Sequence, residues 1–282
     1  MIRRVFRGLY NRYNRQILYR KNKAVLSLNK NLKNTKVGKR CFIMGTGPSI
    51  KDQDILRLKN EYTFVVNNFF KHERFKELRP KFFAYIDPAG FHDGADSNYW
   101  SEQFFGNADL INSVPMTSFF HIKAQNLLET KNLFKSHNVH YLVTDGFFKE
   151  NLNFNTDISK VIPNSKNVII SCIVIAAYMG FEEIYLLGCE HDFLASPTNY
   201  EWSRHFYKSD NFNMNNPEDV KKYNLTVTSY ESVINHASKL FQNYRLLKTK
   251  LAKEKPNVKI YNATPNSFLD VFPYIKFEDI KL

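Results

Sequence analysis

A short apolar run, Cys41–Met44, ends in two glycines and a helix-start signal: Gly45-Thr46-Gly47-Pro48-Ser49-Ile50. The run has the length of a buried strand, the glycines permit a tight turn, and proline suits the first position of a helix. Backbone N–H groups at a helix start attract anions, so this loop predicts a phosphate cradle in a nucleotide site. An ordinary strand-to-helix turn, with glycine needed for geometry alone, is the structural alternative.

The loop does not specify the nucleotide. It lacks the Gly-Lys-Ser/Thr ending of a P-loop, and Ile50 stands where a dinucleotide-binding loop has its third glycine. The sequence therefore predicts a nucleotide without favouring ATP or NAD.

Polar clusters follow other apolar runs in the same way. They are Asn67-Asn68, Asp87-Pro88 and Gly188-Cys189-Glu190-His191-Asp192. Each cluster could be turn chemistry, because Asn, Asp and Gly are common after strands. In open parallel sheets, however, ligands bind outside the carboxyl ends of the strands. We therefore expect the loop at Gly45 and these clusters to face one crevice.

Alternating strand and helix patterns must position these residues. The expected strands are Cys41–Met44, Tyr62–Val66, Lys81–Ile86, Val139–Val143, Asn167–Ile170, Glu183–Leu187 and Val258–Tyr261. The expected helices are Asp54–Leu58, Lys123–Lys135, Cys172–Met179 and Glu231–Lys253. This alternation predicts an α/β fold, a mainly parallel Rossmann-like sheet with helices on both faces.

The stretch from about 190 to 230 is polar, aromatic and without periodicity. A segment of this length in a compact domain indicates a lid or binding loop, and a plain surface insertion is the alternative. It carries Tyr200, Arg204, His205 and Tyr207, and His236 lies near the start of the helix that follows.

The net charge of +13 comes from the N-terminus. Residues 1–40 contain 13 Lys and Arg and no acid, and the other basic residues equal the 27 Asp and Glu in number. Residues 1–37 are therefore predicted to be a basic arm with a polar linker at Ser27–Thr35, and residues 38–282 one nucleotide-binding domain with a core. The three cysteines, Cys41, Cys172 and Cys189, lie in apolar segments and are predicted to be buried thiols of a reducing compartment.

The arm has an amphipathic pattern. Apolar residues recur at helical spacing among arginines: Ile2, Val5, Phe6, Leu9, Tyr13 and Ile17. Such a helix binds anionic membranes, where each basic residue contributes about 1 kcal/mol. As alternatives to a membrane, the arm could dock on the protein's own body, bind a partner protein or bind nucleic acid. No apolar run approaches the roughly 20 residues of a spanning helix, and no secretory signal is expected.

From about residue 38 to 272 these pieces resemble the bacterial sialyltransferases of glycosyltransferase family 42. The family loop Gly-Asn-Gly-Pro-Ser-Leu is similar to Gly45–Ile50, and its asparagine after the second strand matches Asn67. The remaining matches are a serine at Ser171, a Gly-Tyr-Lys-Glu-Ile-Tyr-Leu-x-Gly run at Gly180–Gly188, the catalytic histidine at His236 and a Cys-Pro-Asn-Ser-Leu segment at Thr264–Phe268.

The resemblance implies a GT-A-like enzyme that transfers sialic acid or a related nonulosonate from a CMP-activated donor to a hydroxyl of lipopolysaccharide or capsule, with no cofactor or metal. His236 is the expected general base and His205 its rival. The residues expected to hold the nucleotide or donor are Gly45, Thr46, Gly47, Pro48, Ser49, Asn67, Asn68, Asp87, Ser171, Gly188, Cys189, Glu190, Asp192, Tyr200, Arg204 and Tyr207.

The expected partners follow from the resemblance and the arm. They are the nucleotide-sugar donor, a glycan or glycolipid acceptor, an anionic membrane surface contacted through residues 1–25, and a second copy of the chain. The expected location is cytoplasmic, at the inner face of the membrane. The neutral body has no broad basic face and argues against a nucleic-acid-binding protein.

Departures from the family pattern keep other enzymes open. Thr46 replaces the loop asparagine, Asp87 stands where an asparagine contacts the nucleotide, and Glu190-His191-Asp192 replaces Asp-Phe-Tyr. Glu190 and Asp192 could instead hold Mg²⁺ or Mn²⁺ against a nucleotide diphosphate. The segment Ile86-Asp87-Pro88 also resembles the archaeal pterin pyrophosphokinases and domains of flagellin glycosylation, which makes an ATP-dependent enzyme with Asp87 and Asp192 as metal ligands a third reading.

Overall fold

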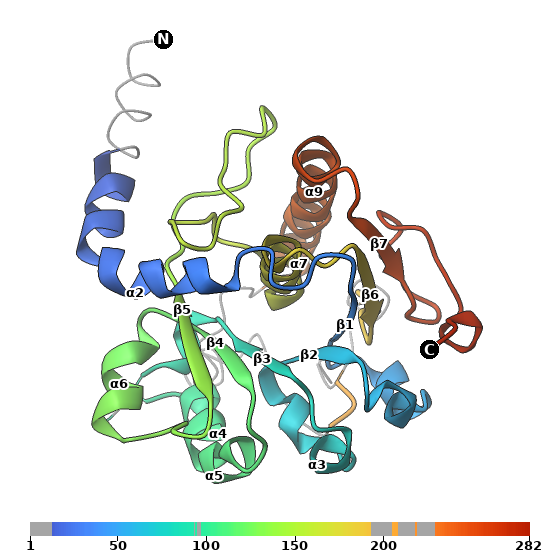
Figure 1. Cartoon of the computed structure of the whole chain (residues 1–282), viewed down its shortest axis with the longest axis horizontal. Coiled ribbons are helices and arrows are strands. Elements are labelled where there is room, and N and C mark those ends of the chain that lie inside the picture. Colours follow the sequence, from blue (N-terminus) through green and yellow to red (C-terminus); the bar gives the residue numbers. More distant parts are fainter. Residues whose placement is uncertain (1–12, 93, 95–96, 193–204, 208–217, 219–228) are drawn as a thin grey trace.

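Seven parallel strands form one sheet at the centre of the molecule (Figure 1). The computed structural model describes residues 13–92, 94, 97–192, 205–207, 218 and 229–282. The strands are β1 (Arg40–Met44), β2 (Tyr62–Val66), β3 (Phe82–Tyr85), β4 (Thr117–His121), β5 (Asn138–Leu142), β6 (Glu183–Leu187) and β7 (Lys259–Asn262). Their order is β5-β4-β3-β2-β1-β6-β7, and each neighbouring pair is parallel. The predicted α/β fold is confirmed.

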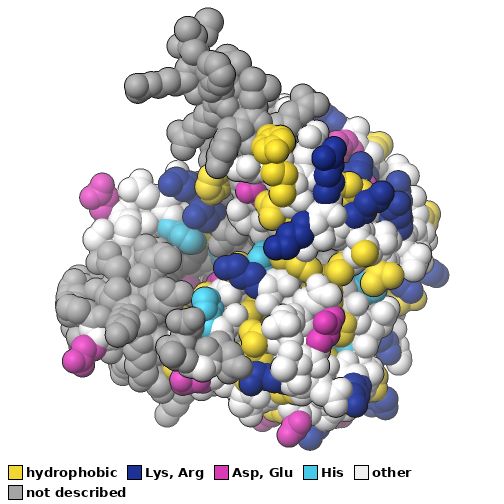
Figure 2. Space-filling view, turned by 90° about the vertical axis from the view of Figure 1, so that its left-hand side faces the viewer, with side chains coloured by type: hydrophobic (Ala, Val, Ile, Leu, Met, Phe, Trp, Pro, Cys, Tyr) yellow, Lys and Arg dark blue, Asp and Glu magenta, His cyan; other side chains and the backbone are white. Residues whose placement is uncertain are grey.

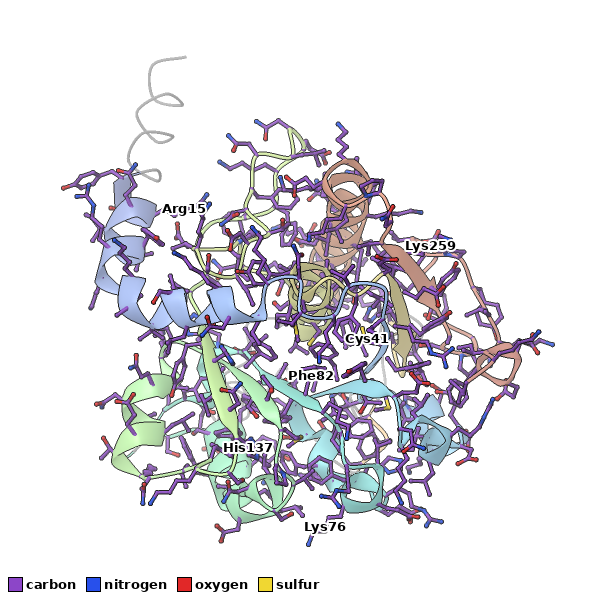
Figure 3. The ribbon with its side chains drawn as sticks, viewed as in Figure 1. Arg15, Cys41, Lys76, Phe82, His137 and Lys259 are labelled. Carbon is purple, nitrogen blue, oxygen red and sulfur yellow. The ribbon has the colours of Figure 1, made fainter. Side chains whose placement is uncertain are left out.

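The central strands are apolar throughout because both faces of the sheet are covered. In β1 all residues after Arg40 are buried, and Cys41 pairs with Tyr62 on one side and Ile184 on the other (Figure 3). One core lies between the sheet and the helices α7 (Val168–Met179) and α9 (Tyr230–Glu254). A second core lies on the opposite face. The helices that cover that face are α3 (Phe75–Leu78), α4 (Tyr99–Gly106), α5 (Ala108–Asn112) and α6 (Ala124–Thr130). Helix α2 (Lys23–Leu28), from the N-terminal part of the chain, packs beside β5.

Helix α9 has the predicted amphipathic stripe. Its buried residues include Val233, Ala237, Leu240, Tyr244, Leu247 and Leu251. Ser229 begins the helix with a capping box, in which its hydroxyl accepts the Ser232 N–H at 3.1 Å.

Two expectations for secondary structure are wrong. The segment Asn167–Ile170, predicted as a strand, is the start of α7, because Asn167 caps the helix and the mainly apolar sequence continues through Ser171 to Met179 without Gly or Pro. Strand β4 was not expected, since Thr117, Ser118 and His121 interrupt its apolar pattern; Ser118 is nevertheless buried and its hydroxyl lies 2.6 Å from His137 Nδ1.

The predicted linker at Ser27–Thr35 instead packs into the body. Asn29 is fully buried, and its amide donates to the carbonyls of Tyr141 at 2.9 Å and Ile158 at 2.8 Å. The Asn34 N–H donates to the Tyr178 carbonyl at 3.1 Å. A polar sequence was read as a solvated linker, but here its amides satisfy backbone groups of the fold.

The three cysteines are free and buried, as predicted. Among the described helices, none is long and apolar enough to cross a membrane.

Candidate functional site

The strand order has a topological switch point between β1 and β6, where the chain connections leave toward opposite edges of the parallel sheet. From β1 the chain proceeds to β2 on one side, and β6 returns on the other side. Ligands of open α/β sheets bind at such a switch point, outside the carboxyl ends of the strands. A cavity of about 530 Å³ lies there, lined by residues from the loops after β1, β2, β3 and β6. In Figure 2 the described surface is hollowed beside the grey atoms, with His, Lys and Arg side chains at the edge.

The predicted polar clusters converge on this cavity. Those that line it are Gly45, Thr46, Gly47, Asn67, Asp87, Pro88, Gly188, Cys189, Glu190, His191 and Asp192. The placement of four separate loops at one crevice therefore follows the expectation, while their binding roles stay predictions.

The glycines of these loops are required by packing. A Cβ on Gly45 would clash with the carbonyl of Gly188, and one on Gly47 would clash with the Glu190 carboxylate. Gly188 has a φ of +61°, and the Gly47 N–H donates to its carbonyl at 3.1 Å. The loops after β1 and β6 thus lie backbone against backbone, which agrees with the structural alternative for these glycines.

The predicted phosphate cradle is occupied by the protein's own carboxylate. The Ser49 N–H donates to Glu190 Oε1 at 2.7 Å, and the following helix is a single 3-10 turn, Pro48–Lys51. Pro48 and Ser49 do not line the cavity. The expectation that the N–H at this helix start is open to phosphate is therefore corrected, because packing of the β6 loop brings Glu190 there. Glu190 is buried, and its Oε2 has no hydrogen-bond partner among the described residues.

His205 binds directly to the loop after β1. Its Nδ1 lies 2.8 Å from Thr46 Oγ1, and the Phe206 N–H donates to the Thr46 carbonyl at 2.9 Å. The ring of Tyr207 stacks on His205 with centroids 4.9 Å apart. Burial lowers the pKa of His205, so its imidazole is neutral at pH 7. His205 thus lines the cavity, whereas Phe206 and Tyr207 pack against the core without lining it. Tyr200 and Arg204 lie outside the described residues.

Asn67 and Asp87 line the cavity from the ends of β2 and β3. Asn67 has a φ of +47°, and the Asp87 carboxylate accepts the Ala89 N–H at 2.9 Å. Asn68 does not line it; the side chain is buried and its Oδ1 has no partner among the described residues.

The start of α7 forms a wall that the sequence did not predict. Residues 164–169 line the cavity, and Asn167 caps the helix by accepting the Ile169 N–H at 2.8 Å. The exposed side chain of Lys166 adds a positive charge to the positive end of this 12-residue helix. Ser171 is buried and reaches the site through Ser165, with 2.7 Å between the two hydroxyl oxygens. The signal was available, because Asn before a long apolar run is a helix-start pattern.

His236 lies at the edge of this wall without lining the cavity. Its pKa is lowered first by partial burial and then by the charge of Lys166, while the Lys166 backbone acts in the opposite direction and raises it. Burial and the Lys166 charge together hold His236 neutral at pH 7 beside the α7 wall.

His191 lines the cavity as part of the predicted cluster after β6, although no binding or catalytic role was predicted for it. Its Nε2 lies 2.9 Å from the hydroxyl of Tyr244, a fully buried residue of α9. Burial lowers the pKa of His191 to about 4, and its φ is +53°. Cys189 beside it is structural: burial raises the pKa of its thiol, and its N–H donates to Thr264 Oγ1 at 3.0 Å.

Glu190 and Asp192, the alternative metal ligands, both line the cavity. Within the described part of the chain no group of three or more His, Cys, Asp or Glu residues is arranged to hold a metal ion.

No protein-family model and no curated protein matches the sequence. Among solved structures, the chain is similar to the MAf glycosyltransferase from Magnetospirillum magneticum AMB-1, with a TM-score of 0.50 and 13% sequence identity. The match covers 94% of this chain and 39% of that one, so the chain spans about two fifths of the protein it resembles. At this identity, the likeness shows a shared α/β, Rossmann-like fold.

Proposed function

We propose that this protein is a glycosyltransferase of bacterial cell-surface glycan synthesis. It transfers sialic acid or a related nonulosonate from a CMP-activated donor to a hydroxyl group of lipopolysaccharide or capsule. The observation that carries the proposal is the convergence of four strand-end loops and the α7 start on one cavity at the β1/β6 switch point. Its volume of about 530 Å³ suits a nucleotide sugar. The fold shared with a glycosyltransferase agrees with it.

The α7 wall favours an anionic group of the donor, whereas the carboxylates Asp87, Glu190 and Asp192 line the other walls of the cavity. Lys166 and the start of α7 attract the phosphate of CMP or the carboxylate of the sugar. Departure of CMP leaves negative charge on a phosphate oxygen, which hydrogen-bond donors at the edge of the cavity stabilise. Tyr207, which stacks on the cavity residue His205, is one candidate, and Arg204 and Tyr200, which lie outside the described residues, are the others.

The general base in this proposal is His236. A neutral imidazole can take the proton of the acceptor hydroxyl, and the lowered pKa keeps His236 neutral at pH 7. His205 is also neutral, but its Nδ1 is engaged by Thr46. That contact favours a positioning role for His205.

A thermal-shift panel of CMP, UDP, GDP and ATP, each with and without magnesium, tests the proposal. Stabilisation by CMP in the absence of magnesium is expected, and Lys166→Met should weaken it. Lys160→Met, in the same loop region but outside the cavity, is the matched control. Stabilisation only by a magnesium-bound diphosphate would overturn the proposal.

A second candidate is a metal-dependent transferase that uses a nucleotide diphosphate. The buried Glu190 Oε2, which has no hydrogen-bond partner in the described part of the chain, favours it, because such an oxygen is stabilised by a cation. Asp192 lines the same cavity. An ATP-dependent pyrophosphokinase with Asp87 and Asp192 as ligands has the same requirement. Full transfer activity in excess EDTA excludes both.

A further inference from the structure

The helix at residues 13–21 attaches to the body by one face. Leu18 and Tyr19 pack against the buried cluster of Leu26, Val143 and Val161. Arg15 lies on the side of the helix that faces the body (Figure 3), with Nε 3.5 Å from the Asp145 carboxylate and Nη2 donating to the Asp145 carbonyl at 3.2 Å. This attachment orients the opposite face of the helix toward solvent.

That opposite face carries the predicted apolar stripe. Tyr13 is 63% exposed and Ile17 is 44% exposed, one helical turn apart. The exposed cations Arg20 and Lys21 follow on the same helix. Docking on the protein's own body uses Leu18 and Tyr19 instead, so the stripe at Tyr13 and Ile17 is left for another partner.

A neighbouring loop adds a third exposed apolar side chain. Phe147, two residues from the Asp145 contact, is 67% exposed, and the exposed Lys149 follows it. The helix and this loop project from the same upper-left part of the molecule in Figure 1. We name Tyr13, Ile17, Arg20, Lys21, Phe147 and Lys149 the docking surface.

The loop of the docking surface continues into the wall of the cavity. Thr144 lines the cavity and directly precedes Asp145. The carbonyl of Gly146 accepts the N–H of Asn164 at 2.9 Å, and Asn164 also lines the cavity. The docking surface is therefore connected through this loop to two residues of the cavity wall.

We propose that the docking surface binds an anionic phospholipid bilayer. Exposed aromatic and aliphatic side chains among cations fit the boundary between headgroups and acyl chains, and the exposed cations Arg20, Lys21 and Lys149 of this surface match an anionic leaflet. Nucleic acid would use the cations, but it has no comparable use for an aliphatic side chain such as Ile17. Lipid binding stands independently of the proposed function. Resting on that function, the acceptor is a glycan anchored in the same bilayer.

Vesicle flotation of the full chain tests the surface. The protein is expected to float with phosphatidylcholine vesicles that contain phosphatidylglycerol and to stay in solution with phosphatidylcholine alone. Ile17→Ser and Phe147→Ser should each reduce the bound fraction several-fold, and the double variant further. Tyr274→Ser, which removes another largely exposed aromatic ring (58% exposed) elsewhere on the protein, should leave binding unchanged.

Three results would overturn the proposal: no flotation of the wild-type chain, flotation that neither variant changes, or binding to DNA or RNA that the anionic vesicles do not compete. Circular dichroism of the variants checks that they fold. The two proposals fail separately. Flotation without nucleotide stabilisation removes the transferase and keeps the docking surface, whereas CMP stabilisation without flotation does the reverse.

Discussion

The carboxylate of Glu190 accepts the backbone N–H of Ser49 at 2.7 Å, which joins the loop after β6 to the loop after β1. The contact requires glycine at position 47, because the Glu190 side chain occupies the space of a Cβ there. The backbone of Glu190 is held from the far side, where its carbonyl accepts the Phe268 N–H at 2.8 Å. The acid is therefore a built part of the cavity wall.

Gly47→Ala should destabilise the fold by about 1–3 kcal/mol, since the methyl group forces the Glu190 carboxylate away from Ser49. Urea unfolding measures the loss. In a Glu190→Ala background the same change should cost less, because the clashing group is gone. Gly106→Ala, where an added Cβ meets no atom within 4 Å, is the control. Equal costs of Gly47→Ala in both backgrounds would contradict the account.

Lys166→Met should weaken binding of CMP and of a CMP-activated acidic sugar by about tenfold, measured by calorimetry. The side chain is exposed at the cavity wall, so the fold should be unaffected. High salt should weaken binding by the wild type more than by the variant, because the lost interaction is between charges. Unchanged affinity would place the nucleotide away from the α7 wall.

Much of the site was predictable because it depends on local pattern and on parallel topology. The loops at Gly45, Asn67, Asp87 and Gly188 each follow an apolar run, and parallel strands bring their carboxyl ends to one edge. The stripe of α9 is likewise a property of its own 25 residues.

The remainder depends on contacts between distant segments. Glu190 and Ser49 are 141 positions apart, and no residue near Ser49 in the sequence predicts the hydrogen bond between them. The wall at Lys166 was missed for another reason: the segment Val168–Ile170, taken without the helix-start signal of Asn167, is equally compatible with a buried strand and with a buried helix. Asn29 was read as part of a linker because burial of its amide is decided by Tyr141 and Ile158.

Stability should fall as pH decreases from about 6.5 to 4. Burial lowers the pKa values of His121, His140 and His191 to about 4, against 6.5 for an unperturbed histidine. In this range the unfolded chain binds more protons than the folded chain, so the free energy of unfolding decreases with falling pH and is level above 6.5. The ceiling is roughly 3 kcal/mol per histidine.

Urea unfolding at several pH values measures this slope. His140→Gln should make it shallower, since Nδ1 lies 2.9 Å from Asn29 Oδ1 and the buried Nε2 has no partner among the described residues to hold a second proton. Equal stability at pH 7 and pH 5 would show that these histidines titrate normally.

Substitutions of His236 and of His205 should change different kinetic parameters. His236→Asn removes the proposed base and should lower kcat by about 10²–10⁴ with little change in KM. His205→Asn should act mainly on nucleotide affinity, because His205 supports the loop through Thr46. A loss of kcat in His205→Asn but not in His236→Asn would make His205 the general base and leave His236 a positioning residue.

The pH dependence of kcat/KM adds a test specific to the contact between His236 and Lys166. A general base must be deprotonated, so activity should rise with pH and reach half its maximum below pH 6.5, because burial and the Lys166 charge lower the pKa of His236. Lys166→Met removes one of those causes and should move the acid limb to higher pH. Lys160→Met leaves His236 untouched and should not move it. An acid limb that stays in place in Lys166→Met, or that persists in His236→Asn, would assign the titrating base to another residue.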